Sequence, residues 1–278
     1  MLKDHIPDLT MEQFERFADF IKKEVYIHLK PIKISLLTNR LRKRLFALNL
    51  TSFDDYYDYL INDESGEEIV FFLEVVTTNE SYFFRNTQNF EMLKKDLLPD
   101  LLSIYRGKVL RFWTAGCSTG EEPYNLAIEL IEGMIGCGFF DFNIRASDIS
   151  RRVVEFAKQG KYSGRKIDKI PEKILSRYFK KEAGEEGFYT VRKDLKSKIE
   201  FHVENLFHAQ MEPVHCIFCR NVLIYFNQED QTKLAHHFYD LLLPGGYLVI
   251  GHAESLHTLK TPFLFKTLPT GTVYYKKS

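Results

Sequence analysis

The sequence contains few cysteines, a single tryptophan and no net charge. Four cysteines among 278 residues cannot form a disulfide scaffold, which excludes the small secreted domains that depend on one. The 38 basic and 38 acidic residues cancel, so no overall field draws the chain to nucleic acid or to an acidic membrane. No apolar run is long enough to span a bilayer, and the first residues do not resemble a signal peptide. We therefore expect a cytoplasmic protein with no membrane insertion.

Two patterns divide the chain. Residues 1–78 repeat apolar side chains at helical spacing, which predicts an all-α N-terminal domain. Residues 79–278 alternate between strand and helix patterns, which predicts an α/β domain with a parallel sheet covered by helices on both faces. A polar stretch at about 163–200 interrupts the alternation and is interpreted as a small antiparallel insertion. The expected strands are 109–115, 142–147, 199–203, 214–219 and 246–251, with helices at 121–135, 150–159 and 228–242 and a C-terminal hairpin within 263–276.

The stretch 109–124, VLRFWTAGCSTGEEPY, is the most informative part of the chain. An apolar strand, a turn of small residues and a helix start are typical of the first unit of a Rossmann-like fold. The turn has neither the GxGxxG pattern nor the Lys-Ser/Thr pair of a phosphate-binding loop. Glu121 and Glu122 begin the helix instead, and a carboxylate there disfavours a pyrophosphate and suits a cationic ligand such as S-adenosylmethionine. The alternative is an ordinary helix start, where the helix dipole favours glutamate.

Polar residues also follow the other expected strands, whose carboxyl ends should open onto one crevice. Asp148 could accept hydrogen bonds from ribose hydroxyls, or it could cap the helix that begins near Ser150. Asn205 could bond the edge of an adenine ring, and Arg220 and Asn221 are expected at the crevice floor. Taken singly, each of these side chains could equally have a structural role, with its hydrogen bonds made to other groups of the protein.

Three further segments each have a functional and a structural interpretation. In 77–85, TTNESYFFR, aromatic residues beside Asn, Ser and Arg suit a segment that folds over a ligand, or a linker that docks through its phenylalanines. The loop after the last core strand, HAES, could line the crevice rim or cap a turn. Cys216 and Cys219 lie in an apolar strand without a second ligand pair, so we expect buried thiols and no metal site.

Five motifs in order resemble the CheR-type chemotaxis receptor methyltransferases over about residues 10–275: TNESYFFRN, WTAGCSTGEEPYNLA, ASDIS, ENLF and FCRNVLIYF. The resemblance implies a methyltransferase that uses S-adenosylmethionine, with a Rossmann-like sheet, an all-α N-terminal domain and an inserted three-stranded β-subdomain. It implies transfer of the methyl group to glutamate side chains of receptor helices, giving methyl esters and S-adenosylhomocysteine. The cofactor contacts that it implies are Asn79, Ser81, Arg85, Glu122 or Glu121, Asp148, Asn205, Leu206, Arg220 and Asn221.

The implied chemistry asks little of the protein. A glutamate with a pKa of about 4.3 is already ionised at neutral pH, so methyl transfer needs no general base. The carboxylate must only be held in line with the methyl group. Our hypothesis assigns this positioning to Arg85 and to Tyr225, which resembles a tyrosine held near the transferred methyl group.

A basic segment points to an acidic protein substrate. Residues 25–53 contain no carboxylate, and we expect Arg40, Arg42, Lys43 and Arg44 to bind the receptor's methylated helices. A solvated helix face is the plain alternative. Nucleic acid is disfavoured by the balanced charge and by the absence of stacking aromatics between the basic residues.

Other partners and functions stay open from the sequence. Some relatives bind a receptor C-terminal peptide through the β-subdomain, and the turn at 183–187 is compatible with this. We expect a monomer. The alternative functions are a related methyltransferase with another substrate, a cofactor-binding module without turnover, and a dinucleotide oxidoreductase, which the acidic turn and the missing glycine pattern disfavour.

Overall fold

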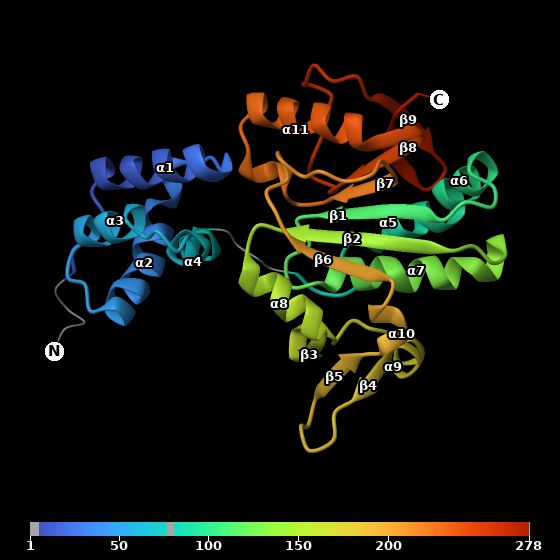
Figure 1. The fold of residues 1–278 in the computed structure, drawn as a ribbon, viewed down its shortest axis with the longest axis horizontal. Coiled ribbons are helices and arrows are strands. Elements are labelled where there is room, and N and C mark those ends of the chain that lie inside the picture. The colour runs from blue at the N-terminus through green and yellow to red at the C-terminus, as the bar shows by residue number, and fades with distance from the viewer. Residues whose placement is uncertain (1–5, 77–80, 278) are drawn as a thin grey trace. The chain divides into compact units, whose positions relative to one another are not determined.

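The computed structural model describes residues 6–76 and 81–277 (Figure 1). The chain divides into two compact units, one formed by Met1–Asn79 with Tyr225–Asn227, the other by Glu80–Ile224 with Gln228–Ser278. Among the described residues, no helix combines the length and the apolar character needed to cross a membrane.

The smaller unit is helical, which confirms the all-α prediction. A capping box begins the first helix, because Thr10 and Gln13 each accept a hydrogen bond from the other's backbone N–H. Phe17 packs against Tyr56 and Phe72, with ring centroids 5.9 and 5.5 Å apart. These aromatic contacts join three helices into one core. The helices are α1 (Met11–Val25), α2 (Ile34–Leu48), α3 (Phe53–Ile61) and α4 (Glu67–Val76), with a short 3₁₀ turn η1 (Pro31–Lys33) before α2.

A buried carboxylate ties these helices together. Glu68 is only 3% exposed and accepts hydrogen bonds from Arg44 Nε at 3.0 Å and from the Tyr56 hydroxyl at 2.7 Å. Burial, and then the bond to Glu68, raises the pKa of Tyr56, so the phenol stays a donor. The hydrogen bond to Glu68 raises the pKa of Arg44. Arg44 therefore serves as an internal connection between α2 and α4.

The larger unit contains a seven-stranded sheet in the order β6-β2-β1-β7-β8-β10-β9. The first five of these strands are parallel, as predicted, and the C-terminal hairpin pairs antiparallel at the sheet edge. The strands are β1 (Leu110–Ala115), β2 (Phe142–Asp148), β6 (Ile199–Val203), β7 (Val214–Cys219), β8 (Leu242–Ile250), β9 (Leu264–Leu268) and β10 (Gly271–Tyr275).

Helices cover both faces of this sheet, with α7 (Glu121–Cys137) and α11 (Gln228–Leu241) on opposite sides in Figure 1. Trp113 of the central strand packs edge-on against Phe238 of α11, with centroids 5.3 Å apart. α8 (Arg151–Gln159) follows β2. The α/β class with helices on both faces is thus confirmed.

The structure differs from the expected elements at two places. No helix was expected at 87–104, where the structure has α5 (Thr87–Met92), the π-helical turn η2 (Leu93–Leu97) and α6 (Leu98–Ile104). The strand expected at 246–251 begins already at Leu242, directly after α11. Its early residues are held in the sheet because Gly245 N–H donates to the Lys276 carbonyl and Lys276 N–H donates to that of Gly246, both at 2.9 Å.

The insertion forms a separate three-stranded antiparallel sheet in the order β3-β5-β4, as expected. The polar turn at 183–187 joins β4 to β5. The insertion comprises β3 (Lys161–Ser163), η3 (Gly164–Lys166), α9 (Glu172–Tyr178), β4 (Phe179–Lys181), β5 (Phe188–Val191) and α10 (Lys193–Lys196).

The Glu68 cluster generates a stability prediction. Replacing Arg44 with methionine leaves a buried carboxylate without its cation, so the free energy of unfolding should fall by about 2–4 kcal/mol. Arg42→Met is the matched control on the same helix. Its ion-pair partner Asp8 has a side chain that is 83% exposed, and its other acceptor is the carbonyl of the partly exposed Ile6, so the loss should be smaller, about 1 kcal/mol. Urea unfolding measures both, and equal losses would contradict a special role for Arg44.

Candidate functional site at the carboxyl ends of the strands

The carboxyl ends of β6, β2, β1 and β7 meet at one edge of the sheet. β1 pairs with β2 on one side and with β7 on the other, so β1 is the point at which the order of the strands along the sheet reverses. Ligands of open α/β sheets bind at such a point. The loop between β1 and α7 lies close to the segment after β7, because a Cβ built on Gly116 (φ +82°) would fall 2.5 Å from a Val222 methyl carbon. The structure therefore brings the strand-end residues singled out in the sequence to a common edge.

Asp148 joins two loops at this edge. One carboxylate oxygen accepts the Ser118 N–H at 2.8 Å, and the other accepts the Ser150 N–H at 3.0 Å. The helix cap of α8 is Ser150, whose side chain accepts from Val153 N–H. The helix-cap interpretation of Asp148 is therefore wrong. Its carboxylate instead holds the β1–α7 loop against the end of β2.

Arg220 is the centre of the site. Its guanidinium donates to Glu122 Oε2 at 2.9 Å and to the Arg85 carbonyl at 2.6 Å, and its side chain is 3% exposed. Burial raises the pKa of Glu122, and the charge of Arg220 opposes that shift. One buried cation thus joins the end of β7, the start of α7 and the segment 81–86.

The two glutamates at the start of α7 face different partners. Glu121 is fully buried and forms an ion pair with Lys166 of the insertion, while the Thr119 hydroxyl donates to it at 2.8 Å. Glu122 faces Arg220. The sequence suggested an acidic turn open to a cationic ligand. In the structure each carboxylate also has a cation from elsewhere in the fold, and Glu122 keeps part of its side chain exposed.

The remaining strand-end residues are held by local bonds. Asn205 Oδ1 accepts the Phe207 N–H at 3.0 Å, which shapes the turn after β6, and Leu206 is buried. Asn221 adopts a left-handed backbone with φ 60° and donates its N–H to Glu254 at 2.9 Å. Glu254 lies in the HAES loop, for which the sequence left two interpretations. Its carboxylate connects the ends of β7 and β8, because it also accepts the Gly251 N–H at 2.6 Å.

The segment 81–86 is anchored by Phe83. This ring is fully buried and packs edge-on against Tyr162 and Phe179, with centroids 5.0 and 5.3 Å apart. Ser81 and Arg85 beside it are partly exposed. Phe84 has a left-handed backbone, which is uncommon for a bulky residue and needs such an anchor. The predicted cofactor residue Asn79 lies outside the described residues.

Several buried polar atoms near this edge lack a hydrogen-bond partner within the described parts of the chain. They include Ser118 Oγ in the β1–α7 loop, Arg220 Nε and Glu254 Oε1. Buried polar atoms are normally paired, so these atoms are left for an ordered water or a bound polar ligand. Both donors and acceptors are present, which fits the hydroxyl, amino and carboxylate groups of S-adenosylmethionine.

The predicted substrate and catalytic residues of the smaller unit differ in exposure and in hydrogen-bond partners. Arg40 donates to the Val75 carbonyl at 2.6 Å, Arg42 to the Ile6 carbonyl at 2.9 Å, and Arg44 to Glu68. Lys43 is exposed. The Tyr225 carbonyl accepts the His28 N–H at 2.7 Å, and its ring lies 5.7 Å from Lys33 Nζ.

The cysteine pair behaves as expected from its apolar strand. Cys216 and Cys219 are both fully buried in β7, and burial raises the pKa of each thiol. They are therefore inert core residues. Among the residues that the structure describes, no group of three or more His, Cys, Asp or Glu side chains could hold a metal ion.

The parallel sheet and the polar residues at its carboxyl edge define an α/β protein of the kind that binds ligands at this edge. Comparison with known proteins gives the family. The model of the CheR methyltransferase SAM-binding domain matches residues 79–272, and that of the CheR all-alpha domain matches 12–77. The chain belongs to the CheR methyltransferase family. It is an S-adenosylmethionine-dependent methyltransferase.

Three relatives illustrate the similarity. The chain is 33% identical over 272 residues to chemotaxis protein methyltransferase 2 of Vibrio cholerae serotype O1, covering 96% of this chain and 94% of that protein. It is 36% identical over 254 residues to chemotaxis protein methyltransferase 2 of Pseudomonas aeruginosa, covering 88% and 87%. It is 34% identical over 270 residues to the chemotaxis protein methyltransferase of Escherichia coli K12, covering 96% and 91%.

The raised pKa of Glu122 predicts a pH dependence. Because burial raises this pKa above 4.5, folded Glu122 takes up a proton at a higher pH than it does in the unfolded chain. Ionised Glu122 therefore lowers the free energy of unfolding at neutral pH. This loss disappears once the pH falls below the pKa that Glu122 has in the unfolded chain. Protonation also removes the charge that pairs with Arg220. We expect the affinity for S-adenosylhomocysteine to fall as the pH is lowered from neutral through the raised pKa of Glu122, at a pH above the 4.5 of a free glutamate.

Calorimetric titration of three proteins checks this expectation. Glu122→Gln should bind S-adenosylhomocysteine more weakly and with little change over the same pH range. Glu155→Gln, an exposed change on α8, should keep the wild-type profile. A Glu122→Gln variant with the wild-type pH profile would contradict the expectation that protonation of Glu122 weakens binding.

Proposed function

We propose that the protein transfers the methyl group of S-adenosylmethionine to glutamate side chains on the cytoplasmic helices of chemotaxis receptors. The products are glutamate methyl esters and S-adenosylhomocysteine. Family membership supports the reaction class, since the relatives are named chemotaxis protein methyltransferases. The observation that carries the proposal is the Arg220 guanidinium, which bonds both Glu122 and the backbone of Arg85. It keeps a cofactor-binding helix start beside the side chain that orients the substrate.

The reaction needs positioning more than proton transfer. S-adenosylmethionine, when bound, supplies an electrophilic methyl group on a sulfonium sulfur. The substrate carboxylate is ionised at neutral pH, so no side chain of this protein has to remove a proton. Arg85 orients that carboxylate through two parallel hydrogen bonds, and Tyr225 assists at the methyl group.

Within the helix start we assign the cofactor contact to Glu122. Glu121 is fully buried and turned to Lys166, whereas the Glu122 side chain keeps 16% of its surface exposed beside Arg220. Asp148 fits the ribose position because it sits at the end of β2 and fixes the β1–α7 loop. The other assigned cofactor contacts are Asn79, Ser81, Arg85, Asn205, Leu206, Arg220 and Asn221.

Receptor recognition is assigned to the basic helix α2. Lys43 is exposed and suits an acidic target, and Arg40 and Arg42 retain partly exposed side chains. Arg44 contributes through the structure of the helix, because it pairs with Glu68. The exposed turn at 183–187 of the β-subdomain is available for a receptor C-terminal peptide. The protein acts in the cytoplasm, and we propose that it does so as a monomer.

Arg85→Ala tests the positioning role. We expect methyl transfer to fall by about 100-fold or more, because the substrate carboxylate loses its orientation. Binding of S-adenosylhomocysteine should weaken far less than turnover falls, since Glu122, Asp148 and Arg220 remain. Labelled methyl transfer onto receptor fragments, read as base-labile ester that releases methanol, measures turnover. Arg106→Ala, an exposed change, is the control.

Two outcomes would count against the proposal. A folded Arg85→Ala protein with near-normal turnover would remove the role given to Arg85. Equal labelling of receptor fragments whose acidic sites are changed to Gln or Ala would show that receptor glutamates are not the acceptors.

A further inference from the structure

One lysine of the insertion contacts both segments that build the cofactor crevice. Lys166 Nζ pairs with the Glu121 carboxylate and donates to the Thr119 hydroxyl at 2.6 Å. The main-chain carbonyl of Lys166 accepts the Phe83 N–H at 3.2 Å. Its side chain therefore holds the β1–α7 loop, and its backbone holds the segment 81–86.

The burial of Glu121 makes its position depend on the contact with Lys166. Glu121 is fully buried, whereas the Lys166 side chain is 31% exposed. A buried carboxylate that loses its cation becomes strongly unfavourable, while a partly exposed lysine that loses its partner is rehydrated. Loss of Lys166 is therefore expected to force Glu121, and the helix start with it, into another arrangement.

Neighbouring residues leave the loop few alternatives. The Tyr162 hydroxyl, also in the insertion, donates to the Thr119 carbonyl at 2.6 Å. Gly120 has φ +93°, and a Cβ there would fall 2.7 Å from the Ala157 Cβ. The turn is thus confined by α8 and β3, and Lys166 supplies the charge that keeps Glu121 in place within it.

We propose that Lys166 is a positioning residue for the methyl-donor site. By holding Glu121 it sets the direction of the adjacent Glu122, which contacts Arg220. The inserted β-subdomain is then part of the cofactor site as well as a surface for receptor peptides. This inference rests on the proposed function in one respect, the assignment of Glu122 and its loop to S-adenosylmethionine.

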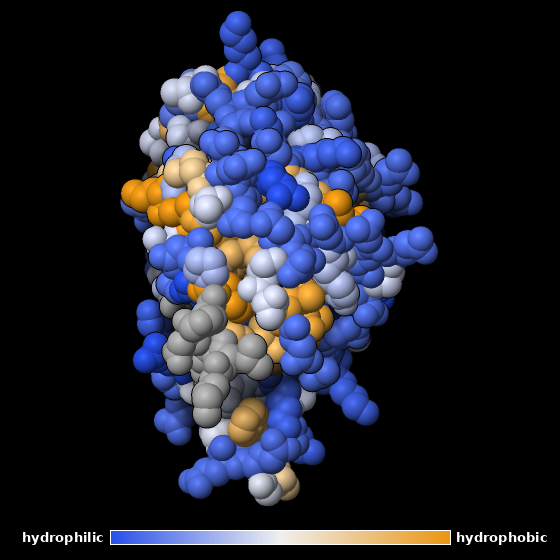
Figure 2. All heavy atoms as spheres, turned by 90° about the vertical axis from the view of Figure 1, so that its left-hand side faces the viewer, coloured by the Kyte–Doolittle hydropathy of each residue, from blue (hydrophilic) through white to orange (hydrophobic). Residues whose placement is uncertain are grey.

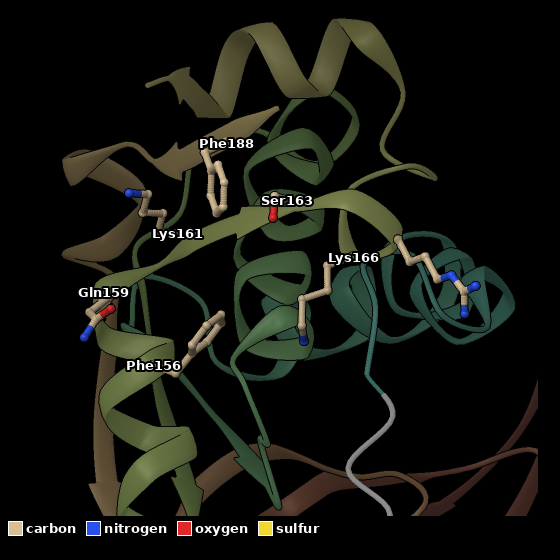
Figure 3. Close-up of a pocket in the computed structure, with 7 residues that line it drawn as sticks. Phe156, Gln159, Lys161, Ser163, Lys166 and Phe188 are labelled. Atoms are coloured by element: carbon tan, nitrogen blue, oxygen red, sulfur yellow. The ribbon is translucent and has the colours of Figure 1, made fainter. Parts of the chain in front are cut away.

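A hollow in the insertion lies beside Lys166 (Figure 3). It has a volume of about 420 Å³ and is lined by Phe156, Gln159, Lys161, Ser163, Arg165, Lys166 and Phe188. An arginine in place of Lys166 keeps the positive charge that pairs with Glu121. Lys161 lies away from Lys166 in the same hollow, where it pairs with Glu185 and lies 5.1 Å from the Phe188 ring centroid. Both of these partners belong to the insertion, so Lys161 serves as the matched control lysine.

The experiment compares calorimetric binding of S-adenosylhomocysteine by the full chain and four variants. Lys166→Met should weaken binding by about 10-fold or more. Lys166→Arg, which keeps the charge, should stay within about 3-fold of wild type, and Lys161→Met within about 2-fold. The double variant Glu121→Gln with Lys166→Met should recover most of the lost affinity, because it no longer buries an unpaired charge. In turnover assays, Lys166→Met should raise KM for S-adenosylmethionine more than it lowers kcat.

The outcomes separate this inference from the proposed function. A folded Lys166→Met protein that binds like wild type, or a Lys161→Met protein that loses as much, would overturn the role of Lys166. Failure of the double variant to recover affinity would do the same, and this arm decides the matter if Lys166→Met does not fold. Failure of the wild-type protein to bind S-adenosylhomocysteine would instead overturn the cofactor assignment itself.

Discussion

The arrangement of the candidate site depends on the bonds of the buried Arg220 guanidinium to Glu122 and to the Arg85 carbonyl. A guanidinium that is 3% exposed must be neutralised and hydrogen-bonded, and Glu122 and the Arg85 carbonyl do both. Because these two partners belong to different segments, the bonds that neutralise the charge also hold the start of α7 and the segment 81–86 to the end of β7. Burial raises the pKa of Glu122, so this arrangement costs stability at neutral pH. Active sites commonly hold such costly groups where geometry matters more than stability.

Two adjacent glutamates illustrate how one helix start serves two purposes. Successive residues on a helix point about 100° apart, so Glu121 and Glu122 cannot share a partner. Glu121 turns to Lys166 of the insertion, and Glu122 turns to Arg220 at the end of β7. One carboxylate thus joins the insertion to the start of α7, and the other joins the start of α7 to the end of β7. Their charges are offset locally, which matches a chain with no net charge.

Much of the fold could be predicted from local patterns. The parallel strands and the helices between them carry strong apolar periodicity, so their types and approximate ranges were correct. The helical stretch at 87–104 was missed, and it contains a π-helical turn (η2) that departs from regular 3.6-residue spacing. The start of β8 was misplaced because Pro244 and Gly245 favour a turn, while bonds from Lys276 hold the backbone in the sheet.

For the site, the sequence by itself determined which polar residues stand at the strand ends, since the alternation of strands and helices places those ends at one edge. It also carried the ordered motifs that mark the family. Only the tertiary structure decided the partners. Lys166 lies 45 residues from Glu121, and Arg220 lies 98 from Glu122. Contacts between such distant residues depend on how the insertion and the sheet close around the turn, and no local periodicity encodes that closure.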